Sequence, residues 1–294
     1  LVYNYSDIKD RLNLDLSFNQ IMKNNTKANV LLVVPARLNS SRLPNKVLAD
    51  IGGKPMLQRV LEQCKEAIDT SKIVLCTDSK KLSSLAKNLS INSILTSESC
   101  NSGTDRIASV LDKIIEISTS GSKKYNFENI DDLKKNTLII NVQGDQPFLD
   151  PRVLDEMCSF FYRSSELPSI VTPIYKLQKD SIHNPSVVKV LVNKNSEAVY
   201  FSRSALPHIR DKSRDEWHLY YDYWGHVGIY GFRADILSNW ERLQSSKLES
   251  SEKLEQLRFI DAGIKIKAFK VNGDFLAIDT KDQLEKARNL LNKL

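Results

Sequence analysis

Three cationic side chains lie close together in residues 33–46, a turn-rich segment that follows an apolar run. Arg37, Arg42 and Lys46 are spaced R-x4-R-x3-K. Arginine forks and a lysine ammonium are the natural partners of phosphate oxygens. The spacing therefore indicates a polyphosphate site, although a solvated basic loop would show the same residues. The chain has neither a Walker loop nor a G-x-G-x-x-G motif.

The cationic segment begins where a strand should end. Residues 31–34 have the continuous apolar pattern of a fully buried strand, and Pro35 has no N–H to extend its hydrogen-bond ladder. Open α/β sheets bind ligands beyond the carboxyl ends of their strands. We therefore expect the three cations at the ligand-binding edge of a sheet.

Two aspartates are candidate ligands for a hard cation. Asp145 lies in Asn141-Val-Gln-Gly-Asp-Gln-Pro147, directly after the apolar run 137–140. Magnesium is usually held by one or two carboxylates together with substrate phosphates, so a second aspartate is expected. Asp279, in the segment 277–282, is the candidate. The alternative for Asp279 is a cap for a helix over 280–291.

The segment Ser102-Gly-Thr-Asp-Arg106 reads as the start of a helix. Ser102 or Thr104 would cap it, and Asp105 would lie in its first turn. A helix start is also a good site for anions and nucleotides. The two readings are compatible.

The elements that must position these residues follow a βα alternation. We predict strands over 30–34, 73–77, 92–96 and 137–143, alternating with helices over 55–67, 79–89, 103–116 and 151–163. This order is typical of a doubly wound, mainly parallel α/β sheet. Strands over 169–174, 187–192, 198–202 and 226–232 then suggest a mixed extension, followed by helices over 248–262 and 280–291.

The motifs of the chain, taken together, resemble the family of CMP-Kdo synthetases, the 3-deoxy-manno-octulosonate (Kdo) cytidylyltransferases. The resemblance runs from about residue 29 to the end, in the family's order. It rests on the P-A-R-x3-S-R-L-P-x-K loop, Gly52-Gly-Lys-Pro-Met56, Thr77-Asp78, Ser102–Arg106, Val142-Gln-Gly-Asp145, Asn184-Pro185, Val188-Lys-Val190, Tyr200-Phe-Ser-Arg203, Pro207, His226-Val-Gly-Ile-Tyr-Gly-Phe-Arg233, Leu254-Glu-Gln-Leu-Arg258 and Ile278-Asp-Thr280.

The resemblance implies magnesium-dependent transfer of CMP from CTP to the anomeric hydroxyl of Kdo, for lipopolysaccharide synthesis, by a nucleotide-diphospho-sugar-transferase-type fold. It implies catalytic roles for Arg37, Lys46, Asp145 and Asp279, the two aspartates holding Mg²⁺. The implied nucleotide-binding residues are Pro35, Ala36, Arg37, Arg42, Lys46, Thr77, Asp78, Ser102, Gly103, Thr104 and Arg106. The implied sugar-binding residues are Gln143, Arg203, His226, Tyr230, Glu255 and Gln256.

Glu255 and Gln256 have a more specific expectation. Leu254 and Leu257 are three residues apart on the predicted helix and can face the core, which leaves the sugar-facing pair on another face. Ordinary strand packing is the alternative reading for the segments around Arg203 and His226.

The chain departs from the family pattern in three places. Asn39 and Asn45 stand where relatives often have glycine. Of the residues other than glycine, asparagine tolerates a positive φ best. Gln146 replaces the usual glutamate beside Asp145, which could change metal affinity or the sugar pocket. The third is an N-terminal extension, residues 1–28, for which a short docking helix and disorder are both plausible.

Two alternative functions stay open. The acceptor could be a related acid sugar, either 8-amino-Kdo or one like sialic acid, although a sialate synthetase should show a different loop. The chain could also be a non-catalytic CTP-binding homologue. Gln146 favours this second reading, and the presence of Arg37, Lys46, Asp145 and Asp279 opposes it.

Composition bounds the class of protein. The 294 residues can bury a large core, and the formal charge of +6 suits anionic substrates but is too diffuse to indicate nucleic acid. The sequence has no run of roughly 18 apolar residues, so no membrane-spanning helix is expected. The four cysteines show no C-x-x-C, which favours reduced thiols in a cytoplasmic protein.

The expected organisation is one cytidylyltransferase domain, 29–294, after the extension. It divides into a nucleotide half over 29–165, a sugar-binding and dimerisation part over 166–262, and a return to the core over 263–294. Residues 208–224 are predicted to form a mobile excursion or a dimer-forming arm, since the family resemblance implies a homodimer.

Overall fold

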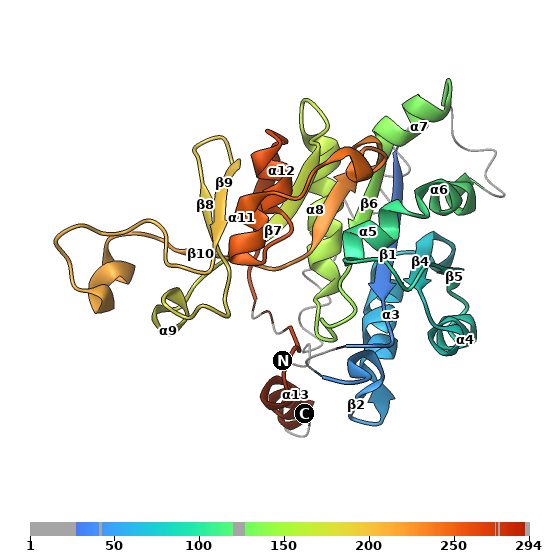
Figure 1. The fold of residues 1–294 in the computed structure, drawn as a ribbon, viewed down its shortest axis with the longest axis horizontal. Helices are drawn as coiled ribbons and strands as arrows, with labels where there is room; N and C mark the ends of the chain where they lie inside the picture. The colour runs from blue at the N-terminus through green and yellow to red at the C-terminus, as the bar shows by residue number, and fades with distance from the viewer. Residues whose placement is uncertain (1–27, 41–42, 120–126, 274, 276, 292–294) are drawn as a thin grey trace, which may run out of the picture.

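The computed structural model describes residues 28–40, 43–119, 127–273, 275 and 277–291. In this part of the chain the main sheet has ten strands, with helices on both faces (Figure 1). The predicted N-terminal extension, apart from residue 28, lies outside the described residues, as does Arg42.

One half of the sheet is parallel, which confirms the predicted α/β class. It runs in the order β5 (Asn92–Leu95), β4 (Ile73–Thr77), β1 (Asn29–Ala36) and β6 (Thr137–Asn141). Ala36 pairs with Thr77, and Val33 pairs with Asn141. Because the strands are parallel, the carboxyl ends of β1, β4 and β6 meet at one edge of the sheet.

The central strand β1 explains the two layers of helices. All eight of its residues are buried. Because both faces of the strand are covered, its sequence is a nearly continuous apolar run instead of an alternation of apolar and polar residues. Val30, Leu32 and Val34 face α3 (Met56–Ala67), α4 (Lys80–Asn88) and α8 (Pro151–Arg163). Leu31 and Val33 face α5 (Gly103–Ala108), α6 (Leu111–Thr119) and α7 (Ile130–Asn136).

The other half of the sheet is mixed, as predicted. Beyond β6 it continues through β11 (Tyr230–Arg233), β7 (Ile170–Lys176), β10 (Trp224–His226), β8 (Lys189–Val192) and β9 (Ala198–Ser202), each antiparallel to its neighbour. The strand β12 (Ile266–Lys270) pairs in parallel with β7. No strand was predicted from the sequence at β12.

Three predicted elements are each broken into two. The predicted strand 226–232 is β10 and β11, separated by a bend at Gly228, whose φ is +85°. The predicted helix 103–116 is α5 and α6, and the Ser109 hydroxyl at the break donates to the carbonyl of Arg106. The predicted helix 248–262 is α11 (Lys247–Glu252) and α12 (Leu257–Asp261), because Lys253 is left-handed with φ 55° and ends α11.

Several short elements were not predicted, and all but Pro55 of β3, which begins the predicted helix 55–67, lie outside the predicted helices and strands. They are β2 (Asp50–Ile51), β3 (Lys54–Pro55), α9 (Lys179–Ile182), α10 (Ala234–Leu237) and the 3-10 turns η1 (Lys46–Leu48), η2 (Thr70–Lys72), η3 (Arg214–Leu219) and η4 (Trp240–Arg242). Of the two asparagines expected to tolerate positive φ, Asn45 has φ 53° at the start of η1, whereas Asn39 does not adopt positive φ.

The last helix, α13 (Lys281–Leu291), returns to the N-terminal half, beside β2 in Figure 1. Leu284 and Ile278 join a small apolar cluster with Ile51 and Met56. Just before this helix, the Ile278 N–H donates to the Asp145 carbonyl at 3.0 Å. This contact brings the segment that contains Asp279 against the end of β6.

The segment 203–223 projects from the body as an arm, at the far left of Figure 1. Within it Trp217 and Tyr223 are buried in a separate cluster with Leu177 and Ile182. The Tyr223 hydroxyl donates to the Pro207 carbonyl at 2.6 Å. Across the described residues, no helix has both the length and the apolar character needed to span a membrane.

Candidate active site

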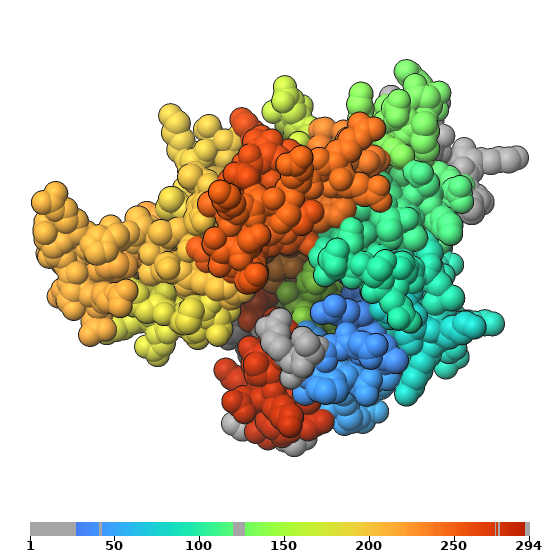
Figure 2. All heavy atoms as spheres, in the orientation of Figure 1, coloured from blue at the N-terminus to red at the C-terminus, as the bar shows by residue number. Residues whose placement is uncertain are grey.

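A cavity of about 290 Å³ lies at the carboxyl ends of β1 and β6. In Figure 2 this face is hollowed between the blue and green N-terminal elements and the orange and red C-terminal ones. The lining residues are Pro35, Ala36, Arg37, Ser40, Lys46, Val47, Cys100, Asn101, Ser102, Gly103, Arg106, Gln143, Gly144, Asp145 and Asp279. The cavity is thus lined by residues of the predicted phosphate-binding segment and by the two predicted metal ligands.

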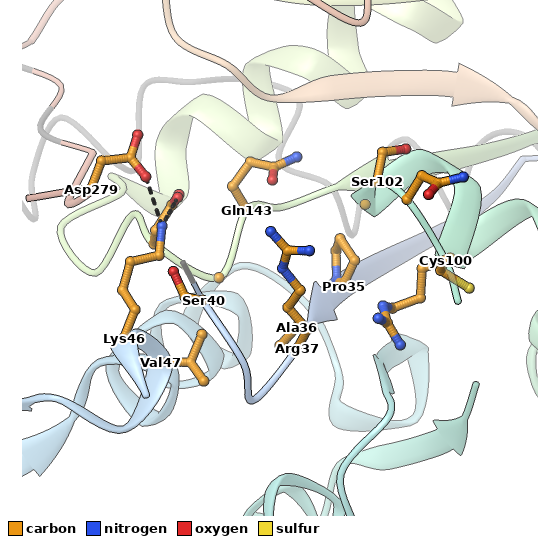
Figure 3. A pocket seen from close by; sticks show the side chains of 15 residues that line it. Pro35, Ala36, Arg37, Ser40, Lys46, Val47, Cys100, Ser102, Gln143 and Asp279 are labelled. Carbon is orange, nitrogen blue, oxygen red and sulfur yellow. Dashed lines mark hydrogen bonds and ion pairs between the residues drawn. The ribbon is translucent and has the colours of Figure 1, made fainter. Parts of the chain in front are cut away.

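Two predicted cations face this cavity. Arg37 directly follows β1, and Figure 3 shows its guanidinium pointing into the cavity, toward Gln143. Among the described residues, no carboxylate lies within salt-bridge distance of Arg37. A guanidinium in this position can bind phosphate oxygens bidentately.

Lys46 joins the two predicted metal ligands. Its Nζ lies 2.7 Å from Asp145 Oδ2 and 2.9 Å from Asp279 Oδ1, as the dashed lines in Figure 3 show. Burial acts to lower the pKa of Lys46, but the two carboxylates outweigh it and hold the pKa above its ordinary value. Lys46 is therefore a cation throughout the physiological pH range. The ammonium shows that Asp145 and Asp279 converge on a single positive charge.

Asp78 and Arg106 form a supporting network at the wall of the cavity, which Arg106 lines. Asp78 Oδ1 accepts from the Leu38 N–H at 3.2 Å, and Asp78 Oδ2 accepts from Arg106 Nη2 at 3.0 Å. Arg106 also donates to Thr96 Oγ1 and to the Ser97 carbonyl, and its side chain is 3% exposed. This network fixes the backbone that follows Arg37, so Asp78 and Arg106 position the cationic loop.

The predicted helix start at Ser102 is present. Ser102 caps α5 by accepting from the Asp105 N–H at 3.1 Å, and both Ser102 and Gly103 line the cavity. A Cβ at Gly103 would lie 3.0 Å from Pro35 Cγ, so glycine lets α5 approach the end of β1. Thr77 is fully buried at the end of β4 and its hydroxyl accepts from the Ser79 N–H, so its side chain does not line the cavity.

A polar region adjoins the cavity beyond Gln143. Gln143 Nε2 donates to Asn141 Oδ1 at 3.1 Å, and Asn141 pairs in register with Tyr230 on β11. The Tyr230 and His226 rings lie 5.1 Å apart between centroids. The predicted sugar residues Gln143, Tyr230 and His226 are therefore neighbours, through Asn141, which the sequence analysis did not name.

Glu255 and Gln256 also approach this region: the pKa of Tyr230 is raised by burial and by the nearby Glu255. The prediction that they occupy a helix was wrong, because Lys253 ends α11 and both residues form the turn before α12. Leu254 and Leu257 are buried, as expected, so the turn keeps the same separation of apolar and polar sides. Burial raises the pKa of Glu255, and the nearby Ser102 and Thr104 hydroxyls partly offset this.

Two buried amide nitrogens from this region have no hydrogen-bond partner among the described residues. They are Asn141 Nδ2 and Gln256 Nε2, in side chains at most 4% exposed. Leaving a buried donor unpaired costs about 1–3 kcal/mol. Unpaired donors from two distant segments are the pattern expected of a site that binds a polyhydroxylated ligand.

Arg203 does not reach the cavity. Its Nε donates to the Glu252 carbonyl at 2.9 Å and its Nη1 donates to the Pro185 carbonyl at 3.1 Å. These bonds join the base of the arm to the end of α11. The guanidinium thus holds two backbone segments, and its implied role in binding the sugar stays a prediction.

The Gln146 side chain is hydrogen-bonded to the segment between β10 and β11. Its side chain is 6% exposed, and Nε2 donates to the Val227 carbonyl at 2.7 Å. The residue therefore supports the bend between His226 and Tyr230.

Some cavity residues were missed by sequence reasoning. Cys100 and Asn101 line the cavity directly before the predicted motif, and Ser40 and Val47 lie in or beside the cationic loop. None of the four is a fixed position of the motifs named from the sequence. Proximity to the named motifs was the only signal that could have found them.

Comparison with known proteins identifies the family. A cytidylyltransferase family model matches residues 31–266. A 3-deoxy-manno-octulosonate cytidylyltransferase from Chloroherpeton thalassium is 37% identical over 265 residues, covering 90% of this chain and 98% of the relative. The chain belongs to this cytidylyltransferase family. A relative of the same name from Francisella tularensis subsp. novicida is 37% identical over 269 residues, covering 90% of this chain and 99% of the relative.

Solved structures agree with this membership. The structure of a CMP:2-keto-3-deoxy-manno-octonic acid synthetase complexed with CTP is 33% identical, with a TM-score of 0.75, covering 90% of this chain and 99% of that protein. A putative glucose-1-phosphate thymidylyltransferase from Bacillus anthracis, 13% identical with a TM-score of 0.59 over 90% of this chain and 96% of that protein, shares the fold. The cytidylyltransferase is thus a nucleotidyltransferase enzyme with the fold predicted for it.

Proposed function

We propose that this cytidylyltransferase transfers CMP from CTP to the anomeric hydroxyl of Kdo, giving CMP-Kdo and pyrophosphate for lipopolysaccharide synthesis. The anomeric oxygen of the sugar attacks the α-phosphorus, the bond from that phosphorus to the bridging oxygen of pyrophosphate breaks, and the hydroxyl proton is lost. Such a transfer needs in-line placement and cations on the oxygens that gain charge.

The cavity residues suit this demand. Arg37 extends from the end of β1 into the cavity, where its fork can hold phosphate oxygens. Lys46 lies across from it, on a side chain that can turn between the two carboxylates and a phosphate. These two cations hold the triphosphate and stabilise the charge that develops on departing pyrophosphate.

Asp145 and Asp279 would hold Mg²⁺. The residues fit this ion because both carboxylates already converge on the Lys46 ammonium, within 2.7 and 2.9 Å. Among the described residues, no cluster of three or more acidic, histidine or cysteine ligands occurs, so the remaining ligands would be phosphate oxygens and water. When bound, the ion would neutralise phosphate charge. The Ile278–Asp145 backbone bond keeps the two ligand segments together.

The adjoining polar region would bind the sugar acid. Gln143, His226, Tyr230, Glu255 and Gln256 surround it, and its unpaired polar atoms can exchange hydrogen bonds with sugar hydroxyls. The region begins at Gln143, which also lines the cavity. A sugar held there would have its reacting hydroxyl near the nucleotide.

One observation carries the proposal: two carboxylates from segments 134 residues apart converge on one cation at the same strand edge as Arg37. A fold that held only a nucleotide base would not need this arrangement. The relatives' names and the CTP-bound synthetase support CTP and Kdo as the substrates.

The test is pyrophosphate release from the purified protein. CTP, ATP, GTP and UTP are each supplied with Mg²⁺ and with Kdo, 8-amino-Kdo or N-acetylneuraminate. We expect fast release with CTP and Kdo alone. Preference for 8-amino-Kdo would reassign the acceptor, and no release with any pair would refute the proposal.

We also propose that the arm contributes to a homodimer. Leu219 and Tyr220, which belong to the arm, are 69% and 52% exposed. Light scattering of the wild type and of a Leu219→Ser/Tyr220→Ser variant tests this. A monomeric wild type would refute it.

A further inference from the structure

Thr172 is a fully buried residue of β7 that the proposed function does not use. Its Oγ1 lies 2.7 Å from the Ile229 carbonyl and 2.9 Å from His226 Nε2. The carbonyl can only accept a hydrogen bond, so the single hydroxyl hydrogen of Thr172 is donated to it. Toward His226 the hydroxyl can then act only as an acceptor.

This arrangement determines which ring nitrogen of His226 carries the proton. A hydroxyl that accepts requires an N–H at Nε2, and a neutral imidazole then has a bare lone pair at Nδ1. We propose that Thr172 is a positioning residue that holds His226 in the Nε2–H tautomer, so that Nδ1 accepts a hydrogen bond from a hydroxyl of the acceptor sugar. The second half of this inference rests on the proposed function.

The surroundings of His226 keep the ring neutral. Phe201 packs edge-on against it at 5.1 Å between centroids, and Tyr230 lies 5.1 Å away on the other strand. The residue as a whole is half-buried, but its ring lies among these side chains, and the loss of hydration there lowers the pKa of His226 to about 3. The imidazole therefore stays uncharged at neutral pH and offers one donor and one acceptor.

The bend that carries His226 is held at two points. Gly228, at the bend between β10 and β11, has φ +85°. The carbonyl before it, on Val227, accepts from Gln146, and the carbonyl after it, on Ile229, accepts from Thr172. Because both flanking carbonyls are bonded to residues of other elements, the bend has little freedom to rotate. Thr172 thus fixes the position of the ring as well as its proton.

The proposal has a consequence for specificity. A bare Nδ1 can accept from a hydroxyl, but it gains nothing from a carboxylate or an ether oxygen, which have no hydrogen to donate. His226 therefore selects a sugar that places a free hydroxyl against it. It does not bind the acid group of the substrate.

The tautomer can be observed directly. Long-range ¹H–¹⁵N spectra of ¹⁵N-labelled protein separate protonated from unprotonated ring nitrogens, and a His226→Asn spectrum identifies the signals among those of the four histidines. At neutral pH we expect a neutral ring with the proton on Nε2. A proton on Nδ1, or a charged ring, would overturn the proposal even if the sugar substrate were a different one.

Kinetics of Thr172→Val complete the test. This nearly isosteric change should raise the KM for the sugar acid about tenfold, as the loss of one hydrogen bond does, and leave the KM for CTP within about twofold. It should also disturb the His226 nitrogen signals, and Thr172→Ser should restore both properties.

Thr137→Val is the matched control. Thr137 is also fully buried, donates to the Leu133 carbonyl at 2.7 Å and accepts from Asn29 Nδ2 at 3.0 Å, but it lies at the opposite end of β6 from Asn141. This variant should lose comparable stability without changing either KM or the His226 signals. If Thr172→Val behaves like Thr137→Val in all three measurements, Thr172 is merely structural and the proposal fails.

Discussion

Replacement of Lys46 by methionine tests the central feature of the site, the cation shared by two carboxylates. The change keeps most of the side-chain volume and removes two charge-assisted hydrogen bonds, of 2.7 and 2.9 Å. Each such bond contributes about 1.5–3 kcal/mol when it is shielded from water. The carboxylates are 22% and 35% exposed, which reduces that contribution. We expect the free energy of unfolding to fall by about 1–3 kcal/mol.

The effect of Lys46→Met on activity should be larger. Loss of one preorganised group that stabilises transition-state charge typically costs about 100-fold to 1000-fold in kcat. Pyrophosphate release measures this, and denaturant unfolding measures the stability. Lys54→Met is the matched control, because Lys54 forms a 2.8 Å ion pair with Glu62 on the surface, where it is 46% exposed. That variant should retain wild-type kcat and lose less than about 0.5 kcal/mol.

Magnesium provides an independent readout of the same cluster. In Lys46→Met the ion can take the place of the ammonium between Asp145 and Asp279, so Mg²⁺ without nucleotide should raise the Tm of this variant relative to EDTA. The double variant Lys46→Met/Asp145→Asn should not respond. Wild-type kcat in Lys46→Met, or a Tm that Mg²⁺ does not change, would refute the reasoning that the two carboxylates form one cation site.

Three further predictions follow from other contacts. Asp145→Asn should lower kcat by at least about 100-fold, measured by pyrophosphate release, with an unchanged circular dichroism spectrum; wild-type turnover would contradict its metal role. Gln146→Leu leaves the buried Val227 carbonyl without its 2.7 Å donor and should cost about 1–3 kcal/mol of unfolding free energy, together with a higher sugar KM; an unchanged sugar KM would mean that the bend needs no such support. The pKa of His226 in the folded protein is about 3. Between that value and about 6.5 the unfolded chain binds one more proton than the folded chain. The free energy of unfolding therefore decreases as the pH falls, by at most about 1.4 kcal/mol per pH unit. His226→Gln should lack this share of the slope in unfolding measured from pH 7 to 5, and an identical slope would contradict the neutral ring.

The sequence alone determined the parallel half of the sheet and the edge at which ligands bind. The continuous apolar run at 31–34 and the proline after it are local signals, and they predicted a buried strand that ends at a cationic loop. Arg37, Lys46 and Asp145 could be named because each lies in the polar segment that follows such a strand. Local periodicity reports the type of an element and its end, whatever the rest of the chain does.

Breaks within elements were much harder to predict. The helix expected over 248–262 is interrupted at Lys253, although lysine is not a residue that favours φ 55°. The cost of such a conformation is a few kcal/mol at most and is met by packing on both sides of the break. The pattern of apolar residues does not reveal this break, because Leu254 and Leu257 can be buried whether the helix is continuous or interrupted.

Only the tertiary structure decided which distant residues meet. Lys46 contacts Asp145 and Asp279, which are 99 and 233 residues away in the sequence. Gln146 and Val227 are 81 residues apart, and Thr172 and His226 are 54 residues apart. Each contact depends on strand order and register, which arise from the packing of the whole sheet between two layers of helices. The sequence therefore supplied the chemical groups of the site, whereas long-range packing determined their partners, their burial and, for His226, the nitrogen that carries the proton.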